Sequence, residues 1–326
     1  FLMSLSNLPA IAASLIQQGK SPDTPAAVIQ QGTTARQRVV TASLSEIAAE
    51  VQRQGIHTPA MTVIGDVVSL RQQLSWFGQG ELSGKKVLLT GTPAYTRKAA
   101  EQLRSCGAEP VEVSLIYPKA SSPDVLKALP WQSYTWAVLT SANGVEQLFA
   151  SLKQSHVDLR QLLHLRFAAI GNGTAQALAE HGIFVDCVPE HFDSRSLAEA
   201  LIPQLTMQDR VLLLRAENGS VILPQLLEQA GKAVDTVLLY RVQTDLRKRE
   251  LLLQELADTD YVFLASASAA RAFAEMTAGT KTAAKLISIG NATTKAAETA
   301  GLPVAETAVQ SDIAGMIACI RKENEV

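Results

Sequence analysis

The chain has 326 residues, of which 47% are hydrophobic and 18% charged, so it can form two or three domains with real cores and is too apolar to be disordered. Its formal net charge of −2 provides no global basic field, which argues against nucleic acid or a membrane surface as a partner. The three cysteines lie far apart in apolar runs and predict free thiols in a reducing cytosol, with no metal site. The apolar runs are too short to span a bilayer.

Residues 1–77 differ in pattern from the rest of the chain. Helical patterns at 8–18 and 44–55 flank the extended stretch TPAAVIQQG. The opening FLMSLSNLPAIAASLI has no initiator methionine and reads as the middle of a domain, which predicts that the sequence is a piece of a longer protein. The polar, glycine-rich residues 78–84 predict a linker.

From residue 85 onward, short apolar strands alternate with helical stretches. The strands are KVLLTG, AVLTSA, FAAIG, DRVLLLRA, VDTVLLY, YVFLASA and KLISIG. Strands that are apolar throughout and are each followed by a helix are typical of parallel sheets covered on both faces. We therefore expect an α/β fold. In the helix of SANGVEQLF, Asn143 and Glu146 have the spacing of a capping box.

A turn occurs twice in this region. IGNGTAQALAEHG (170–182) is matched by ISIGNATTKAAETAGL (287–302), and each copy follows an apolar strand and opens a helix. We expect two similar lobes, each with this turn at the carboxyl edge of its sheet, where amides at a helix N-terminus favour an anion. Thr174 and Thr293 are expected to cap these helices and to offer a hydroxyl to a ligand. The simpler interpretation, that a Gly-x-x-Thr turn only starts a helix, stays open.

Two further side chains stand at strand ends. Arg215, in LLRAENGS, can form paired hydrogen bonds with a ligand carboxylate, or can pair with Glu217 and hold its loop. Tyr240 ends TVLLY, and a neutral phenol can donate a proton or a hydrogen bond. The alternative for Tyr240 is an ordinary half-buried tyrosine at the end of a strand.

Residues 85–320 resemble uroporphyrinogen-III synthase. The segments that carry the resemblance are VLLTG…AAEQLRSCGAEPVEVSLI, LTSANGVEQLF, AAIGNGTAQALAEHGI, LLLRAENGSVILPQLLEQAG, VLLYR and ISIGNATTKAAETAGLPV. The resemblance implies two doubly wound parallel-sheet lobes joined by a two-stranded connection. Lobe 1 would be discontinuous (85–118 and 244–322), and lobe 2 would comprise 120–241.

The family cyclises hydroxymethylbilane to uroporphyrinogen III with inversion of ring D, and it needs no cofactor. By this resemblance Tyr240 assists departure of the substrate hydroxyl. The substrate-binding residues it implies, together with those at the turns and strand ends above, are Thr90, Ser141, Asn143, Gly171, Asn172, Thr174, Arg215, Ser266, Ser268, Gly290, Asn291 and Thr293. The sequence departs from the family where Thr90 is followed by Gly91, and at Ala265–Ser268, so the substrate contacts near these positions are less defined.

Residues 1–77 resemble the end of uroporphyrinogen-III C-methyltransferase, through FLMSLSNLPAIAASLIQQGKSPDTPAAVIQQGTTARQRVVTASLSEI and GIHTPAMTVIGDVVSLRQQLSWF. By this resemblance Met3 and Gly32 are remnants of an S-adenosylmethionine site, in a partial α/β subdomain. The glycine-rich first half of that enzyme is absent, so we expect no methyl transfer. S-adenosylmethionine would serve only the complete methyltransferase domain.

The resemblance also implies a cytoplasmic protein, a fusion of two successive steps towards sirohaem and cobalamin, with homodimerisation through the methyltransferase part. Two other functions remain possible from the sequence. One is a non-catalytic bilobal binding module. The other is an S-adenosylmethionine-dependent methyltransferase in the full-length fusion, with the synthase part as a scaffold.

Overall fold

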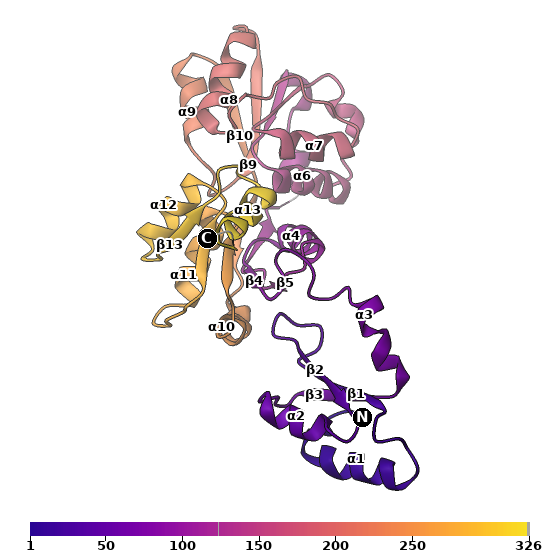
Figure 1. Ribbon diagram of the computed structural model, residues 1–326. Coiled ribbons are helices and arrows are strands. Elements are labelled where there is room, and N and C mark those ends of the chain that lie inside the picture. The colour runs from indigo at the N-terminus through magenta and orange to yellow at the C-terminus, as the bar shows by residue number, and fades with distance from the viewer. Residues whose placement is uncertain (123, 325–326) are drawn as a thin grey trace. The chain divides into compact units, whose positions relative to one another are not determined.

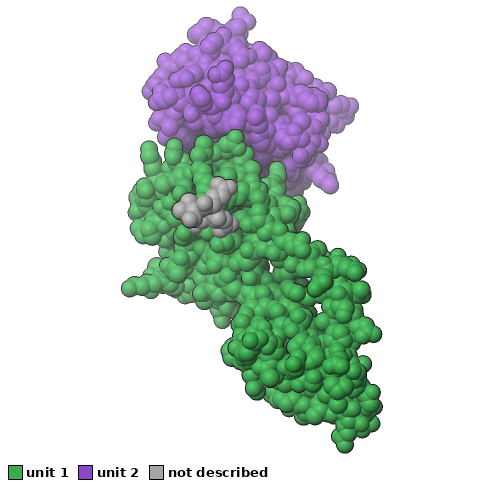
Figure 2. Space-filling view, viewed as in Figure 1, with its two compact units in different colours: residues 1–116, 245–326 green, residues 117–244 purple. Residues whose placement is uncertain are grey.

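The computed structural model describes residues 1–122 and 124–324 of the chain (Figure 1). They divide into two compact units, which Figure 2 shows in different colours. Unit 1 contains residues 1–116 and 245–326, and unit 2 contains residues 117–244. Within the described ranges, no helix combines the length and apolarity that crossing a membrane requires.

The N-terminal segment of unit 1 is a small antiparallel sheet. Its strands β1 (Pro25–Gln30), β2 (Arg38–Ser43) and β3 (Ala60–Ile64) pair in the order β2-β1-β3. Helices α1 (Leu8–Gln17) and α2 (Ile47–Arg53) cover one face through Leu8, Ile47 and Val51. A 3-10 turn (Asp66–Leu70) and the short α3 (Arg71–Leu74) lead out of this segment.

The rest of unit 1 is a five-stranded parallel sheet in the order β13-β12-β11-β4-β5. Its strands are β4 (Lys86–Leu89), β5 (Glu109–Glu112), β11 (Tyr261–Leu264), β12 (Lys285–Ser288) and β13 (Val304–Thr307). Its helices are α4 (Pro93–Ser105), α10 (Arg249–Leu256), α11 (Ala267–Met276), α12 (Asn291–Thr299) and α13 (Ile313–Asn324). Leu82, inside the expected linker, is fully buried in this core, so the segment packs on the sheet.

Unit 2 contains the second five-stranded sheet, in the order β6-β10-β9-β7-β8. Its strands are β6 (Ile116–Ala120), β7 (Trp136–Leu139), β8 (Arg166–Ala169), β9 (Arg210–Ala216) and β10 (Ala233–Thr244). Its helices are α5 (Asp124–Lys127), α6 (Ala142–Gln154), α7 (Asn172–Glu180), α8 (Ser194–Leu201) and α9 (Ile222–Gln229). Ala137 and Leu139 join one core, while Trp136 and Val138 join the core on the opposite face. Because successive strand residues point to opposite faces, this alternation shows a sheet covered on both sides.

The two sheets share a central order, β9-β7-β8 in unit 2 and β4-β11-β12 in unit 1. In each sheet the last of these strands, β8 or β12, leads into the repeated turn. The α/β prediction with two parallel sheets is confirmed. The chain passes between the units along β6 and β10, which run in opposite directions: Ser121 N donates to Leu239 O, and Asp245 N donates to Leu115 O.

Candidate functional site

Ser141 and Tyr240 come together at the carboxyl edge of the unit 2 sheet. The Ser141 hydroxyl lies 2.9 Å from the Tyr240 hydroxyl and accepts a hydrogen bond of 3.0 Å from Gly144 N. Tyr240 is only 3% exposed, and burial raises the pKa of its phenol, while the contact with Ser141 acts in the opposite direction. The phenol is therefore neutral at physiological pH and keeps a proton to donate.

Ser141, and not Asn143, is the N-cap of α6. Its backbone is extended and its hydroxyl accepts from Gly144 N, whereas Asn143 lies within the first turn of the helix. The predicted capping box at Asn143 and Glu146 is wrong, because the chain enters the helix two residues earlier. Ser266 has the same role in unit 1, where its hydroxyl accepts from Ala269 N at 3.1 Å. Ser268 lies partly exposed in the first turn of α11.

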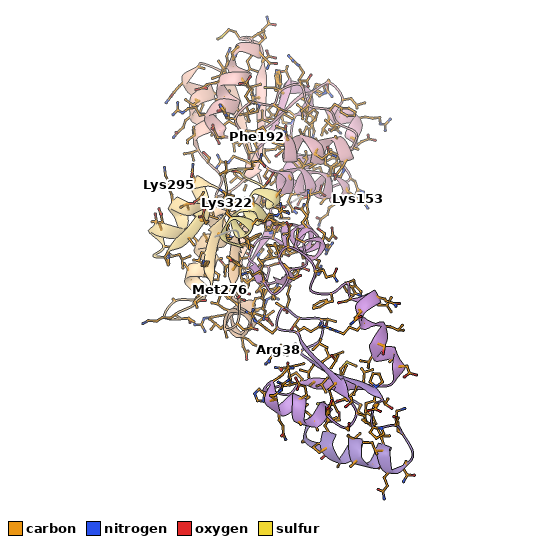
Figure 3. All side chains as sticks on the ribbon, in the orientation of Figure 1. Arg38, Lys153, Phe192, Met276, Lys295 and Lys322 are labelled. Atoms are coloured by element: carbon orange, nitrogen blue, oxygen red, sulfur yellow. The ribbon has the colours of Figure 1, made fainter. Side chains whose placement is uncertain are left out.

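The repeated glycines are the N-caps of α7 and α12. Gly171 and Gly290 both have extended backbones, at φ −179° and 169°, so left-handed geometry does not explain the glycine. Close approach does: a Cβ on Gly171 would lie 2.9 Å from the Phe192 ring, and one on Gly290 would lie 2.8 Å from Ser311 Oγ. Phe192 is labelled in Figure 3. No pattern in the sequence signals these two covering residues.

Thr174 and Thr293 do not cap their helices, contrary to the prediction. Each lies in the first turn, and its own amide donates to the carbonyl of the capping glycine, at 3.1 Å from Thr174 to Gly171 and 2.9 Å from Thr293 to Gly290. Both residues are 4% exposed. Among the described residues, neither hydroxyl has a hydrogen-bond partner in the structure. Asn172 and Asn291 are the exposed first residues of these helices.

Three other hydroxyls, which were not among the predicted site residues, form a cluster next to the unit 1 turn. Thr294 Oγ1 lies 2.6 Å from Ser288 Oγ and 2.7 Å from Thr307 Oγ1. Because these groups satisfy one another, they fix the turn between β12 and α12. In the sequence, the only indication of this cluster is that a hydroxyl residue stands at the end of β12, in the first turn of α12 and at the end of β13.

Arg215 holds its own loop. Its guanidinium donates to the carbonyl oxygens of Ala216 at 3.1 Å, Gly219 at 2.6 Å and Ser220 at 2.8 Å. The side chain is 6% exposed, and burial lowers its pKa. Glu217 contributes through its backbone, since its N–H donates to Tyr240 O at 2.8 Å. The arrangement joins the Arg215 loop to the strand that carries Tyr240.

Thr90 lies in the interior of unit 1. It is fully buried, and its hydroxyl donates to Phe263 O at 2.7 Å, so it ties β4 to β11. This geometry favours a structural role for Thr90 over a substrate contact.

Met3 and Gly32 line one pocket in unit 1 with a volume of about 660 Å³. Met3 is 78% exposed. Apolar side chains of residues 1–61 form part of the wall, and Lys86, Glu109 and Asp258 of the following sheet complete it. The structure thus brings the two expected cofactor contacts together. Within residues 1–122 and 124–324, no cluster of three metal-ligating side chains is present.

The fold and these edges define a class of protein: a two-unit α/β protein with matching strand–turn–helix edges rich in hydroxyl groups. The profile described as "Uroporphyrinogen-III synthase HemD" matches residues 97–318. The chain belongs to the uroporphyrinogen-III synthase family, which acts in tetrapyrrole biosynthesis.

Individual relatives agree with this placement. "Porphyrin biosynthesis protein HemD" of Ruminiclostridium josui is 31% identical over 307 residues, covering 91% of this chain and 60% of that protein. The uroporphyrinogen-III synthetase of Helicobacter pylori has the same fold, with a TM-score of 0.56 at 19% identity over 73% of this chain and 99% of that one.

The N-terminal part resembles a segment of uroporphyrinogen-III C-methyltransferase. The enzyme of that name from Bacillus subtilis is 31% identical over 201 residues, 60% of this chain and 40% of that protein. The chain therefore spans only about 60% or less of the curated relatives named here.

Proposed function

We propose that this chain cyclises hydroxymethylbilane to uroporphyrinogen III, with inversion of ring D and without a cofactor. The observation that carries the proposal is the shared design of the two sheets. Each ends in a glycine-capped helix whose buried threonine, Thr174 or Thr293, has a hydroxyl that makes no hydrogen bond to another described residue. Membership of the synthase family supports the reaction.

The helix entrances are suited to the substrate's carboxylates. In α7 and α12 the first-turn threonine amide is satisfied by the capping glycine, while the amides before it have no intrahelical acceptor. Such amides and the positive end of the helix dipole stabilise carboxylates. Because every pyrrole of the substrate carries an acetate and a propionate, two such entrances would fix the chain of rings at several points. The catalytic effect would come largely from this orientation.

Tyr240 would act on the leaving hydroxyl. Its buried, neutral phenol is a proton donor or hydrogen-bond donor, and Ser141 fixes the orientation of its hydroxyl through the amide of Gly144. Loss of water leaves an azafulvene cation, and attack from the substituted carbon of the last ring gives a spiro intermediate that reopens and closes with this ring reversed. Asn143, Ser266 and Ser268 are proposed as substrate contacts at the same edges. Arg215 would act by shaping its loop.

The domain division proposed here is a methyltransferase-like segment (1–77), a linker (78–84), a discontinuous lobe 1 (85–118 and 244–322) and lobe 2 (120–241). We further propose that the segment does not transfer methyl groups and that S-adenosylmethionine serves only a complete methyltransferase domain. A cytoplasmic location and dimerisation through that domain in the longer protein are also proposals.

The test is to add hydroxymethylbilane to the purified chain and to identify the product isomers by chromatography. We expect uroporphyrinogen III in excess over the isomer I that forms spontaneously. Isomer I alone would reject the proposal and leave a binding module as the alternative. Tight binding of S-adenosylmethionine, with methylated product, would instead support methyltransferase activity.

A matched pair of variants tests the tyrosine. Tyr240→Phe should slow turnover by about 10–100-fold, because general acid assistance typically contributes at least that much. Tyr134→Phe is the control: Tyr134 is also 3% exposed in unit 2, but it precedes β7 and so lies at the opposite edge of the sheet. Equal rates for wild type and Tyr240→Phe would remove Tyr240 from the mechanism.

A further inference from the structure

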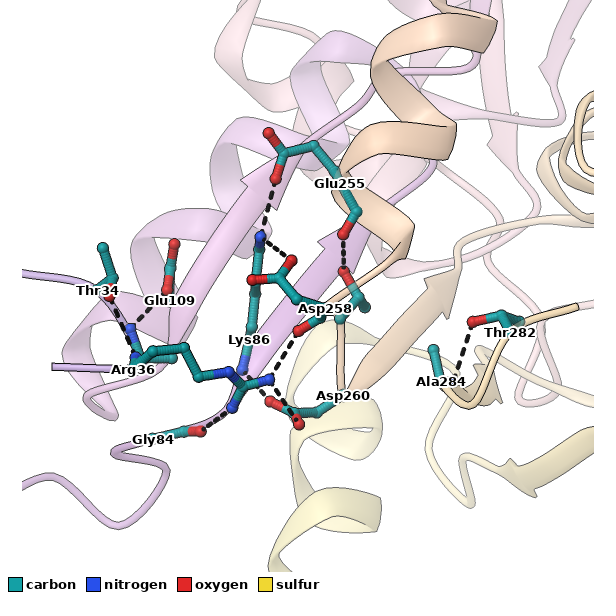
Figure 4. Close-up of polar contacts among 12 residues, drawn as sticks. Thr34, Arg36, Gly84, Lys86, Glu109, Glu255, Asp258, Asp260, Thr282 and Ala284 are labelled. Atoms are coloured by element: carbon teal, nitrogen blue, oxygen red, sulfur yellow. Dashed lines mark hydrogen bonds and ion pairs between the residues drawn. The ribbon is translucent and has the colours of Figure 1, made fainter. Parts of the chain in front are cut away.

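The loop between β1 and β2 contacts the parallel sheet of unit 1 through Arg36 (Figure 4). The guanidinium donates to Asp260 Oδ1 at 3.0 Å, to Asp258 O at 2.7 Å and to Gly84 O at 3.1 Å. The other carboxylate oxygen of Asp260 accepts from Lys86 N at 2.7 Å. Asp260 therefore joins Arg36 to the first residue of β4. The hydrogen bond to Asp260, together with the nearby carboxylates, raises the pKa of Arg36 above its usual value.

A second contact comes from the backbone of the same loop. Ala35 N donates to Glu109 Oε2 at 2.5 Å, and Glu109 is the first residue of β5. The contacts with Lys86, Glu109 and Asp260 all lie at the amino-terminal ends of parallel strands. The repeated turn of unit 1 follows the carboxyl end of β12, so it lies at the opposite edge of this sheet.

The loop has a strained backbone. Gln31 and Thr33 have positive φ values of 46° and 68°, which is unusual for residues other than glycine and especially for a β-branched one. Such conformations persist only where the surroundings enforce them. Inside the loop, Gln37 accepts from Thr33 N at 2.7 Å. The contacts of Ala35 and Arg36 with the sheet are the external restraints.

We propose that residues 31–37 form a docking loop that attaches the N-terminal segment to the amino-terminal edge of the unit 1 sheet. Docking fixes the loop conformation and thereby the shape of the 660 Å³ pocket that contains Gly32. By thermodynamic linkage, a molecule that binds this pocket more tightly when the loop is docked also stabilises the docked state. The factor is the same as the one by which docking strengthens its binding. The sheet of the synthase family thus controls the geometry of a pocket built mainly by residues 1–61.

The exchange rate of the Ala35 amide reports the dock directly, because its acceptor is the Glu109 carboxylate. Hydrogen exchange measured at single-residue resolution on the whole chain should show that Arg36→Ala speeds Ala35 exchange about tenfold, since charge-assisted hydrogen bonds are lost at a partly exposed site. The intrinsic rate of this amide is unchanged, because it depends on residues 34 and 35.

Arg38→Ala is the matched control. Its guanidinium donates to Gln54 O at 2.6 Å and Gly55 O at 3.3 Å, within the N-terminal segment, and Arg38 is labelled in Figure 3. Asp260→Asn should speed Ala35 exchange by less than Arg36→Ala does, because Arg36 keeps its bonds to Asp258 O and Gly84 O. The double variant should exchange no faster than Arg36→Ala alone. Wild-type protection in Arg36→Ala, or equal loss in Arg38→Ala, would overturn the proposal. The assay needs no substrate, so its result is independent of the proposed synthase activity.

Discussion

Replacing Ser141 by alanine should have a larger effect than replacing Ser266, although both serines are N-caps of corresponding helices. Each change removes a cap bond, to Gly144 N or to Ala269 N, and costs about 1 kcal/mol. Only Ser141→Ala also removes the partner of the buried Tyr240 hydroxyl. An unsatisfied buried polar group costs about 1–3 kcal/mol more. We therefore expect a total cost of about 2–4 kcal/mol for Ser141→Ala.

Urea denaturation measures this difference. Trp131 and Trp136 are buried in unit 2, whereas Trp76 of unit 1 is exposed, so the change in tryptophan fluorescence on unfolding comes mainly from the unit that contains Ser141. Far-UV circular dichroism follows the secondary structure of both units, so a transition seen by circular dichroism and not by fluorescence belongs to unit 1, in which Ser266→Ala is expected to cost only the cap. The double variant Ser141→Ala with Tyr240→Phe should recover about 1 kcal/mol or more relative to the sum of the single variants, because neither hydroxyl is then left alone. Equal costs for the two serine variants, or strict additivity in the cycle, would refute the coupling of cap and phenol.

Three other outcomes are expected. Asp193 caps α8 by accepting from Ser196 N and Arg195 N, and these bonds lower its pKa. Its contribution to stability is therefore present above the unfolded-state pKa and is lost as pH falls through the folded-state pKa. Asp193→Asn should keep most of the cap but lose the acid-dependent part, as measured by thermal melts at pH 2–7, a range set by the ordinary carboxyl pKa of about 4. Gly171→Ala should reduce turnover more than the exposed Gly173→Ala, because only the former meets Phe192, and steady-state kinetics compares them. Arg215→Lys should impair KM and kcat nearly as much as Arg215→Met, since one ammonium cannot replace three directed bonds, and a fully active lysine variant would contradict the loop role.

Local signals in the sequence were sufficient to predict the edges of the sheets. Gly171 and Gly290 were expected after strands and at helix starts, and the structure places them there as N-caps. The capping residue was harder to predict: Asn143 has the better pattern with Glu146, but Ser141 caps α6. A capping box is a match of residue types at fixed spacing, whereas the actual cap depends on where the strand ends and the backbone turns.

Side-chain partners were not predictable from the sequence, whether they lie in the same loop or far away along the chain. Arg215 was expected either to bind a carboxylate or to pair with Glu217, and it instead bonds three carbonyl oxygens of its loop. Thr90 was expected to bind substrate, and it is fully buried, with its hydroxyl donating to Phe263 O. For both residues, the role depends on which hydrogen-bond acceptor lies near the side chain in the folded protein. Residue type and spacing do not specify this acceptor.

The sequence by itself determined the α/β class, the two similar sheets and the likeness to the synthase family, because hydrophobic period and turn residues act over a few neighbouring positions. Tertiary structure decided that Tyr240 meets Ser141, ninety-nine positions away, and that Arg36 reaches Asp260 across 224 positions. The first pair forms where parallel strands from separate parts of the chain end at the same edge of a sheet, and the second forms where the β1–β2 loop meets the amino-terminal ends of the strands in unit 1. Strand order is set by the packing of the whole domain.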